Sequence, residues 1–221
     1  MMMAMRMPAE SHLEDIYEEA PAERNREVLY RGLAWTVLRG VFAPYPTFGS
    51  NTGITPKNRE MYEGKTVLDL GCGSGVRGII AAMSGAEHVL ATDINRTACV
   101  NTAMNAERHG MSVSVLQADM FAGIGGTFDT IVSYLPSRDA PIDSPEQIAT
   151  HDPGLRLNKR LIDEGRDYLK PGGTLHTSFL DQGGIADMKD RIVARGYEIE
   201  SHKVRPHETT GDWHFFSLRA E

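Results

Sequence analysis

The stretch Asp69–Gly75, with the sequence DLGCGSG, decides the fold of this chain. It follows a short run of buried-strand character that ends at Leu70, and it precedes helical spacing that begins at Val76. Glycines at such a strand–helix turn let the backbone bend sharply and let a ligand approach main-chain atoms. A dinucleotide-binding turn needs its third glycine, or an alanine, one residue later. Val76 occupies that place, so the motif argues against a nicotinamide cofactor.

Strands and helices alternate along the chain after this turn. Strand character covers residues 66–70, 88–93, 113–119, 128–133 and 174–180, and helical spacing covers residues 76–83, 96–109, 157–169 and 185–195. Two last strands, 197–204 and 213–219, have no helix between them and predict an antiparallel hairpin at one edge of the sheet. We expect an α/β fold with a doubly wound, seven-stranded and mostly parallel sheet.

The segment from Ser11 to Phe42 shows helical spacing, and residues 43–53, which follow it, are rich in turn formers. Ser11 and Glu14 fit a capping box, and Pro21 fits the first turn of a second helix. Apolar residues continue at helical spacing through Val28, Leu29, Leu33, Val37, Leu38 and Val41. We therefore expect a disordered leader over residues 1–10, a helical cap and loop over 11–63, and the main domain over 64–221.

Composition and charge restrict the classes of partner. The chain of 221 residues carries a formal charge of −7, from 23 Lys plus Arg against 30 Asp plus Glu. Proteins that bind polynucleotides usually present a basic face, so this balance argues against a nucleic acid substrate. No apolar run is long enough to cross a bilayer, and Cys72 and Cys99 fit neither a disulfide framework nor a metal site. We expect a cytoplasmic protein without a membrane span or a metal.

Two further acidic residues end strands of the predicted sheet. Asp93 ends the second strand, where a carboxylate can accept hydrogen bonds from both ribose hydroxyls of a cofactor. Asp119 ends the third strand and can accept from an adenine amino group, while Met120 and Phe121 cover the ring. Asp69 suits a cofactor that carries a cationic amino acid. Each acid alone also fits a helix N-cap, but three at one edge of a sheet predict a ligand site.

Residues 67–75 (VLDLGCGSG) resemble the first motif of class I S-adenosylmethionine-dependent methyltransferases. Residues 93–95 (DIN) and 101–106 (NTAMNA) are similar to the second region of the release-factor glutamine methyltransferase group. The resemblance implies a Rossmann-like methyltransferase fold with S-adenosyl-L-methionine as the cofactor. We assign cofactor contacts to the residues around the three strand ends: Asp69, Gly71, Cys72, Gly73, Gly75, Asp93, Ile94, Asp119, Met120, Phe121 and Ser133.

The segment after the fourth strand departs from that group. Its members carry an Asn-Pro-Pro-Tyr motif there, whose asparagine and first proline carbonyl accept hydrogen bonds from the nitrogen that is methylated. This chain has Tyr134, Leu135, Pro136 and Ser137 in those places. A phenol does not offer the donor and acceptor pair of an asparagine amide, so the departure argues against glutamine or adenine as the acceptor.

Candidate catalytic residues lie in and after this segment. Methyl transfer needs alignment of the acceptor and exclusion of water, and it needs a base where the nucleophile arrives protonated. Tyr134 is a candidate by its position at the end of the strand, and His151 with Asp152 follows in the next loop. The substrate pocket is assigned to the aromatic loop before the main domain and to the segment after the fourth strand: Tyr45, Thr47, Phe48, Tyr134 and Pro136.

The sequence favours a methyltransferase that acts on a heteroatom, expected to be nitrogen, of a small metabolite. The acidic charge, the altered motif and the lack of a recognition domain in this sequence support that expectation. A protein or RNA acceptor is the first alternative. A degenerate protein that binds the cofactor without transferring methyl is the second, and a nicotinamide-dependent reductase is the third.

Overall fold

The computed structural model describes residues 25–30, 32–43, 56–206 and 211–221. The expected leader over residues 1–10 and the pocket residues Tyr45, Thr47 and Phe48 lie outside these ranges. Among the described helices, none combines the length and the apolar character that a membrane crossing requires. The proposed division of the chain at residue 64 stays a prediction.

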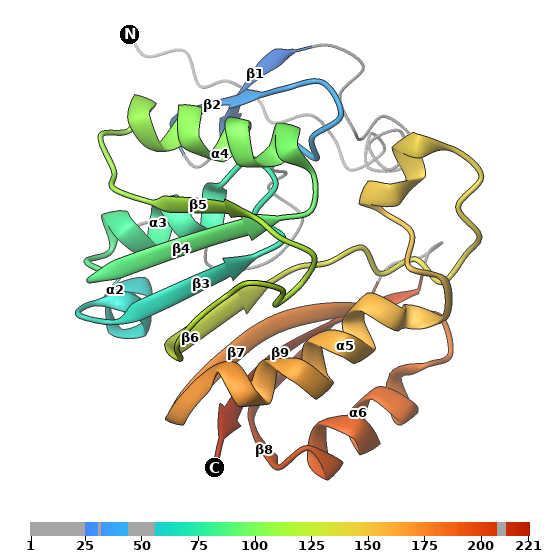
Figure 1. The fold of residues 1–221 in the computed structure, drawn as a ribbon. Coiled ribbons are helices and arrows are strands. Elements are labelled where there is room, and N and C mark those ends of the chain that lie inside the picture. The colour runs from blue at the N-terminus through green and yellow to red at the C-terminus, as the bar shows by residue number, and fades with distance from the viewer. Residues whose placement is uncertain (1–24, 31, 44–55, 207–210) are drawn as a thin grey trace, which may run out of the picture.

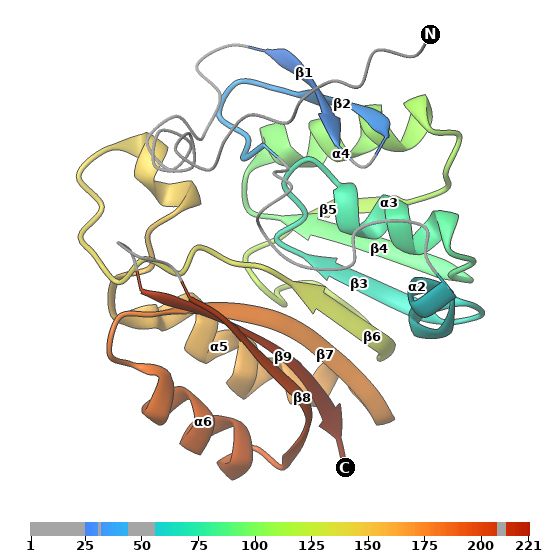
Figure 2. The same cartoon turned by 180° about the vertical axis from the view of Figure 1, so that it is seen from behind.

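The main sheet has seven strands in the order β5-β4-β3-β6-β7-β9-β8 (Figures 1 and 2). Its strands are β3 (Thr66–Leu70), β4 (His88–Asp93), β5 (Ser114–Gln117), β6 (Phe128–Ser133), β7 (Leu169–Asp181), β8 (Tyr197–Arg205) and β9 (Asp212–Ala220). The first five are parallel, whereas β9 pairs antiparallel with both β7 and β8. The prediction of a seven-stranded, doubly wound α/β fold with an antiparallel C-terminal hairpin is confirmed.

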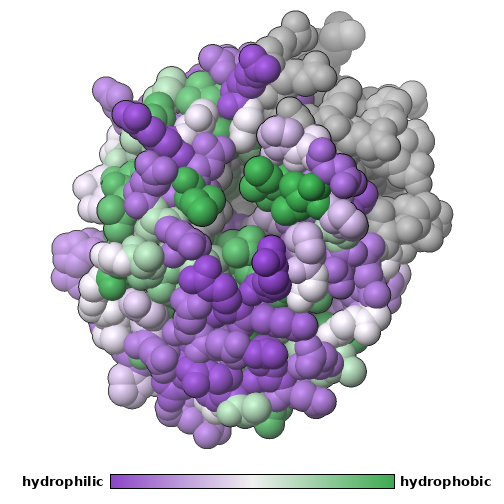
Figure 3. Space-filling model, turned by 45° about the vertical axis from the view of Figure 1, so that its right-hand side comes forward, coloured by the Kyte–Doolittle hydropathy of each residue, from purple (hydrophilic) through white to green (hydrophobic). Residues whose placement is uncertain are grey.

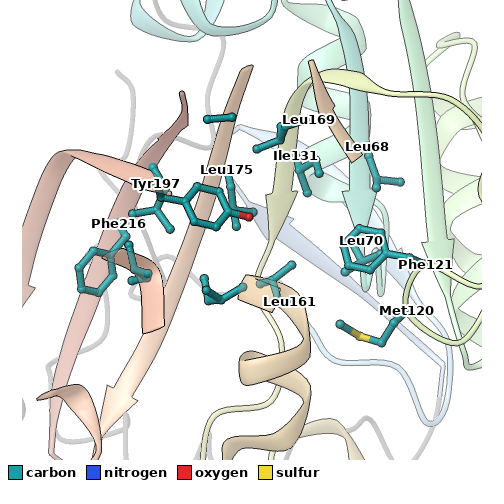
Figure 4. Close-up of a cluster of buried hydrophobic side chains, with 14 of the residues drawn as sticks. Leu68, Leu70, Met120, Phe121, Ile131, Leu161, Leu169, Leu175, Tyr197 and Phe216 are labelled. Carbon is teal, nitrogen blue, oxygen red and sulfur yellow. The ribbon is translucent and has the colours of Figure 1, made fainter. Parts of the chain in front are cut away.

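Helices cover both faces of this sheet, as Figure 1 shows. They are α2 (Pro56–Tyr62), α3 (Val76–Met83), α4 (Arg96–Arg108), α5 (Arg156–Gly165) and α6 (Ile185–Ala194). On the face of α5 and α6, Leu68, Ile131 and Leu175 from three neighbouring strands pack against Leu161 (Figure 4). Successive strand residues point to opposite faces, so Asp69 points toward α3. Because helices cover both faces of the sheet, a ligand can reach the sheet at the ends of its strands.

The structure corrects the expected helix over residues 11–42 wherever that segment is described. Residues 26–37 form an antiparallel hairpin of β1 (Arg26–Tyr30) and β2 (Leu33–Val37). Exposure alternates along β1, with Leu29 72% exposed and Tyr30 2% exposed, and Trp35 in β2 is fully buried. This period of two suits a strand with one buried face. Over so short a stretch the apolar residues fit both the helical period and the strand period, and contacts with the rest of the fold decide between the two structures.

Two buried asparagines of α4 attach the hairpin to the main domain. Asn105 accepts a hydrogen bond from Thr36 N (2.9 Å) and donates to Thr36 O (2.9 Å) and to Ser74 O (2.8 Å). Asn101 accepts from Leu38 N (2.8 Å) and donates to Thr36 O (2.8 Å). Their amides thus bond β2 as a neighbouring strand would, and Asn105 joins it to the glycine-rich turn. In both ribbon views the hairpin lies beside α4 (Figures 1 and 2).

Replacing Asn105 by alanine is therefore expected to lower the free energy of unfolding by roughly 2–4 kcal/mol, because it leaves buried backbone groups without partners. Urea unfolding measures this difference. Met104→Ala, which shortens a side chain 44% exposed on the same helix, serves as the control and is expected to change stability by less than about 1 kcal/mol. Equal effects of the two substitutions would contradict the anchoring role of Asn105.

Some element boundaries differ from those expected. Strand β7 begins at Leu169 and runs through Pro171-Gly172-Gly173, which the sequence predicts as a turn before the strand. Its pairing with β6 shifts register between Phe128 and Thr130. A side chain at Gly173 would lie 3.1 Å from the carbonyl oxygen of Phe128, so glycine allows the two backbones to approach.

Candidate active site

A cavity of about 750 Å³ lies at the carboxyl ends of the parallel strands. It lies where the strand order reverses between β3 and β6, the usual ligand position in open α/β sheets. Figure 3, which brings the right-hand side of Figure 1 forward, shows a hollow with hydrophobic side chains on both sides. The walls include Asp69, Gly71, Cys72, Gly73, Ser74, Arg77, Asp93, Ile94, Asp119, Met120, Tyr134, Leu135, Pro136, Ile148, Leu157, Trp213 and Phe215.

The glycine-rich turn forms one wall. Gly71, Gly73 and Gly75 have φ angles of +75°, +54° and +83°, a region that residues with a Cβ atom rarely adopt. A Cβ on Gly73 would meet no atom within 4 Å, whereas a Cβ on Gly75 would lie 2.8–3.0 Å from Thr102. Gly75 therefore permits the packing of the turn on α4, and Gly73 leaves space on the side of the cavity.

Asp69 lies at the base of this turn. Its side chain is 2% exposed, and its Oδ2 accepts a hydrogen bond from Gly78 N at 2.8 Å. Burial raises the pKa of the Asp69 carboxyl to about 6, although the bond from Gly78 and the charge of Arg77 both act to lower that pKa. A cationic ligand in the cavity would stabilise the ionised form of this buried carboxyl.

The carboxylate of Asp93 organises the neighbouring loop. It accepts hydrogen bonds from Gly73 N at 3.0 Å and from Asn95 N at 2.8 Å, so it ties the glycine-rich turn to the start of α4. Burial raises the pKa of Asp93. Ile94 is 61% exposed at the edge of the cavity. Asp93 and Ile94 thus offer a carboxylate and an apolar side chain to a nucleoside at this edge of the cavity.

The other predicted cofactor residues divide into two groups. Asp119 and Met120 border the cavity, and Asp119 also pairs with Arg160 at 3.1 Å. Phe121 is not part of the wall; its ring stacks on Tyr168 with the centroids 4.5 Å apart. The Ser133 hydroxyl is buried and donates to Leu70 O at 2.8 Å. Phe121 and Ser133 thus support the fold beside the site.

The segment after β6 forms the wall next to the glycine-rich turn. Tyr134 and Pro136 both border the cavity, as predicted for substrate residues. The carbonyl oxygen of Leu135 accepts a hydrogen bond from Ser137 Oγ at 3.0 Å, and that of Pro136 accepts from Asn158 Nδ2 at 2.6 Å. Two main-chain oxygens of the altered motif are therefore already bonded to side chains.

His151 and Asp152, predicted as catalytic residues, do not border the cavity. The carboxylate of Asp152 is buried and accepts from Leu157 N at 3.0 Å and from Asn158 Nδ2 at 2.8 Å, which caps the start of α5. His151 Nδ1 lies 2.8 Å from the hydroxyl of Thr150. Of the three predicted catalytic residues, Tyr134 is the one that reaches the cavity.

Comparison with known proteins decides the class of enzyme. Residues 40–188 match the family described as Methyltransferase small domain. The chain belongs to this family. It is an S-adenosylmethionine-dependent methyltransferase.

Relatives of this methyltransferase include enzymes named for protein substrates. The release factor glutamine methyltransferase of Deinococcus radiodurans is 33% identical over 207 residues, 87% of this chain and 72% of that protein. A protein of Methanocaldococcus jannaschii, provisionally named a protein N5-glutamine methyltransferase, is 31% identical over 65% of this chain and 76% of its own length. The ribosomal protein L11 methyltransferase of Halalkalibacterium halodurans is 33% identical, and the match spans 39% of its length.

Solved structures share the fold of the methyltransferase at low identity. The ribosomal protein L11 methylase of Lactobacillus delbrueckii subsp. bulgaricus has a TM-score of 0.60 and 21% identity, and the match covers 88% of this chain and 97% of that one. The magnesium protoporphyrin IX methyltransferase of Synechocystis PCC 6803, solved with bound S-adenosylmethionine, has a TM-score of 0.57 and 18% identity over 72% of each chain.

The predicted small-metabolite substrate is wrong. The relatives that match most of this methyltransferase are named for methylation of proteins. The expectation rested on net charge, on the altered motif and on the absence of an appended domain. None of these properties distinguishes a metabolite from a peptide segment, because acceptor choice depends on the geometry of a few residues of the site.

The cavity fits S-adenosylmethionine by the chemistry of its walls. Asp69, Asp93 and Asp119 border it at successive strand ends, and the open side of Gly73 admits a ligand against the backbone. The cofactor supplies a methyl group on a positively charged sulfur. The protein residues hold the cofactor, orient the acceptor and exclude water.

Sequence reasoning missed several wall residues. Arg77 lies on α3, with its guanidinium carbon 3.1 Å from the centroid of the Tyr134 ring. Trp213 and Phe215 project from one face of β9, and Ile148 comes from the short 3-10 helix Pro145–Ala149 that precedes α5. Arg77 carries one signal, since it follows the glycine-rich turn by two residues. The others become neighbours only through the order of the strands.

Stability of the methyltransferase without cofactor is expected to depend on pH through Asp69. The unfolded chain ionises this carboxyl near its ordinary pKa, whereas the folded chain keeps the proton up to about pH 6. Folding is therefore penalised as the pH rises through that window, by roughly 3 kcal/mol in total. Asp69→Asn removes this penalty, so its stability relative to the wild type should increase between about pH 4 and pH 7.

Urea unfolding of both proteins over that range measures the effect. Asp167→Asn, which changes a carboxylate 74% exposed and outside the cavity wall, provides the control. A difference between Asp69→Asn and the wild type that does not change with pH would contradict the raised pKa of the Asp69 carboxyl.

Proposed function

We propose that this enzyme methylates a nitrogen atom of a protein. The observation that carries the proposal is the match to a release factor glutamine methyltransferase over 87% of this chain and 72% of that relative. A second relative, provisionally named for glutamine N5 of proteins, supports the same class of acceptor. The cytoplasm is the proposed location, since relatives are named for release factors and a ribosomal protein.

The walls of the cavity support an acceptor that enters as a side chain on a peptide. Ile148, Trp213 and Phe215 give an apolar wall beyond the glycine-rich turn. Such a wall can bind the aliphatic part of a long side chain and the residues beside it. Tyr134 borders the same cavity, and its ring contacts Arg77 beside the glycine-rich turn. We therefore assign Tyr134 to orienting the acceptor nitrogen.

The way this enzyme holds that nitrogen differs from the Asn-Pro-Pro-Tyr pattern. Tyr134 replaces the asparagine, and the carbonyl of Leu135 accepts the Ser137 hydroxyl at 3.0 Å. We propose that the phenol oxygen of Tyr134 is the polar contact for the acceptor. The acceptor nitrogen is then held by one oxygen and by apolar walls, rather than by a pair of amide-binding oxygens.

Transfer of labelled methyl tests the proposal. The enzyme is incubated with methyl-labelled S-adenosylmethionine and an extract of its source cells, and the products are separated with a small-pore filter. Label that stays above the filter, resists nuclease and is released by protease is the expected result. Label that nuclease releases would replace the protein acceptor with RNA, and label that passes the filter would refute a macromolecular acceptor altogether.

A further inference from the structure

Arg77 is a charged wall residue whose guanidinium is not used by the fold. It is the second residue of α3 and borders the cavity beside the glycine-rich turn. No hydrogen bond or ion pair among the described residues includes this side chain. Its contact is the Tyr134 ring, 3.1 Å from the guanidinium carbon. A half-buried arginine whose guanidinium makes no hydrogen bond or ion pair is unusual, because charged side chains that leave solvent are normally bonded to a partner.

The contact with Tyr134 fixes the guanidinium and leaves its donors free. A guanidinium that lies over an aromatic ring uses its flat face, and its five N–H groups point outward in the plane. These donors match the two oxygens of a carboxylate in a planar, bidentate pair. The structure thus offers an oriented donor group at the cavity wall.

An opposite charge lies at the same end of the cavity. Asp69 is close enough to Arg77 for the guanidinium to lower the pKa of the carboxyl. Both side chains border the cavity, and both adjoin the glycine-rich turn at residues 71–75. The turn is followed by the N-terminus of α3, whose dipole also favours a negative group. One positive and one negative residue of the same cavity wall complement a zwitterion.

We infer that Arg77 binds the carboxylate of the methionine part of S-adenosylmethionine, while Asp69 supplies the negative charge for its ammonium group. Arg77 is then a cofactor-binding residue, with the Tyr134 ring as its support. The inference concerns cofactor binding and is independent of the class of acceptor.

Calorimetric binding of two ligands tests this role without any acceptor. The ligands are S-adenosylhomocysteine and its decarboxylated analogue, which keeps the amine and lacks only the carboxylate. The wild type should bind S-adenosylhomocysteine more tightly than the analogue by about tenfold to 100-fold. Arg77→Gln should lose that preference, by weakening S-adenosylhomocysteine alone and leaving the analogue unchanged.

Controls separate this role from a general effect on the fold. Arg96→Gln removes an exposed charge at the start of the neighbouring helix, outside the cavity wall, and should leave both affinities unchanged. Arg77→Lys keeps the charge without the planar pair and should restore part of the preference. The inference is overturned if Arg77→Gln weakens both ligands equally or affects neither.

Discussion

Alanine at position 75 is expected to lower the free energy of unfolding by roughly 2–5 kcal/mol. Gly75 has a φ angle of +83°, where a Cβ atom is strained, and that atom would lie 2.8–3.0 Å from Thr102, including its Cα. Thr102 cannot retreat easily, since it is fully buried on α4 and its hydroxyl donates to Gly73 O at 3.1 Å. The turn and the helix would have to separate.

Urea unfolding at a fixed pH measures this effect, and two other glycines supply matched controls. Gly110→Ala also puts a Cβ at positive φ (+65°), but no atom lies within 4 Å, so roughly 1 kcal/mol is expected. Gly73→Ala should cost about as much in stability while weakening S-adenosylhomocysteine binding, because it adds a Cβ in open space at a residue of the cavity wall. If Gly75→Ala and Gly110→Ala prove equally stable, the close packing of the turn on α4 is refuted.

Removal of the Asp93 carboxylate is expected to weaken S-adenosylhomocysteine binding by about 100-fold or more. The side chain borders the cavity and also holds Gly73 N and Asn95 N, so Asp93→Ala removes a charged ligand contact and loosens the turn. Hydrogen bonds from the two ribose hydroxyls to a charged carboxylate would together contribute roughly 3 kcal/mol or more to binding, which corresponds to that factor.

Titration calorimetry measures the loss, with Asp163→Ala as a control at a carboxylate that pairs with Arg191 away from the cavity. Burial raises the pKa of Asp93, so this carboxylate gains a proton earlier than an exposed aspartate when the pH is lowered. The affinity of the wild type for S-adenosylhomocysteine should therefore begin to fall at a higher pH than an exposed aspartate would give. Binding that survives Asp93→Ala within about threefold would place the nucleoside elsewhere.

The central part of the fold follows from local signals in the sequence. Strand β3 is a buried apolar run, and the turn after it contains glycines that must adopt positive φ, so both features are visible without tertiary information. The strand ends then bring Asp69, Asp93 and Asp119 to one edge by topology alone. For this reason the cofactor class was predictable, and most of the residues predicted to contact the cofactor border the cavity.

The remaining features depend on contacts between distant segments. The spacing from Val28 to Val41 fits a helix, but Asn101 and Asn105 bond the backbone of β2 and favour a hairpin. Trp213 and Phe215 reach the cavity because β9 lies between β7 and β8, which the sequence does not specify. Asp152 resembles a catalytic partner of His151 in sequence, yet its oxygens are used at the start of α5. The acceptor class depends on cavity residues that, like Trp213 and Phe215, come together through the order of the strands. The sequence alone did not show these neighbours, and the prediction of a small metabolite was therefore wrong.

Hydrogen–deuterium exchange with and without S-adenosylhomocysteine tests most directly whether this cavity is the cofactor site. The structure predicts slower exchange in peptides that cover the glycine-rich turn at residues 71–75 and the segment from Asp93 to Asn95, because both segments border the cavity and Asp93 bonds the amides of Gly73 and Asn95. Peptides from α6 and β8 should be unchanged. Protection confined to α6 and β8, or no protection at the turn with saturating ligand, would contradict this assignment of the site.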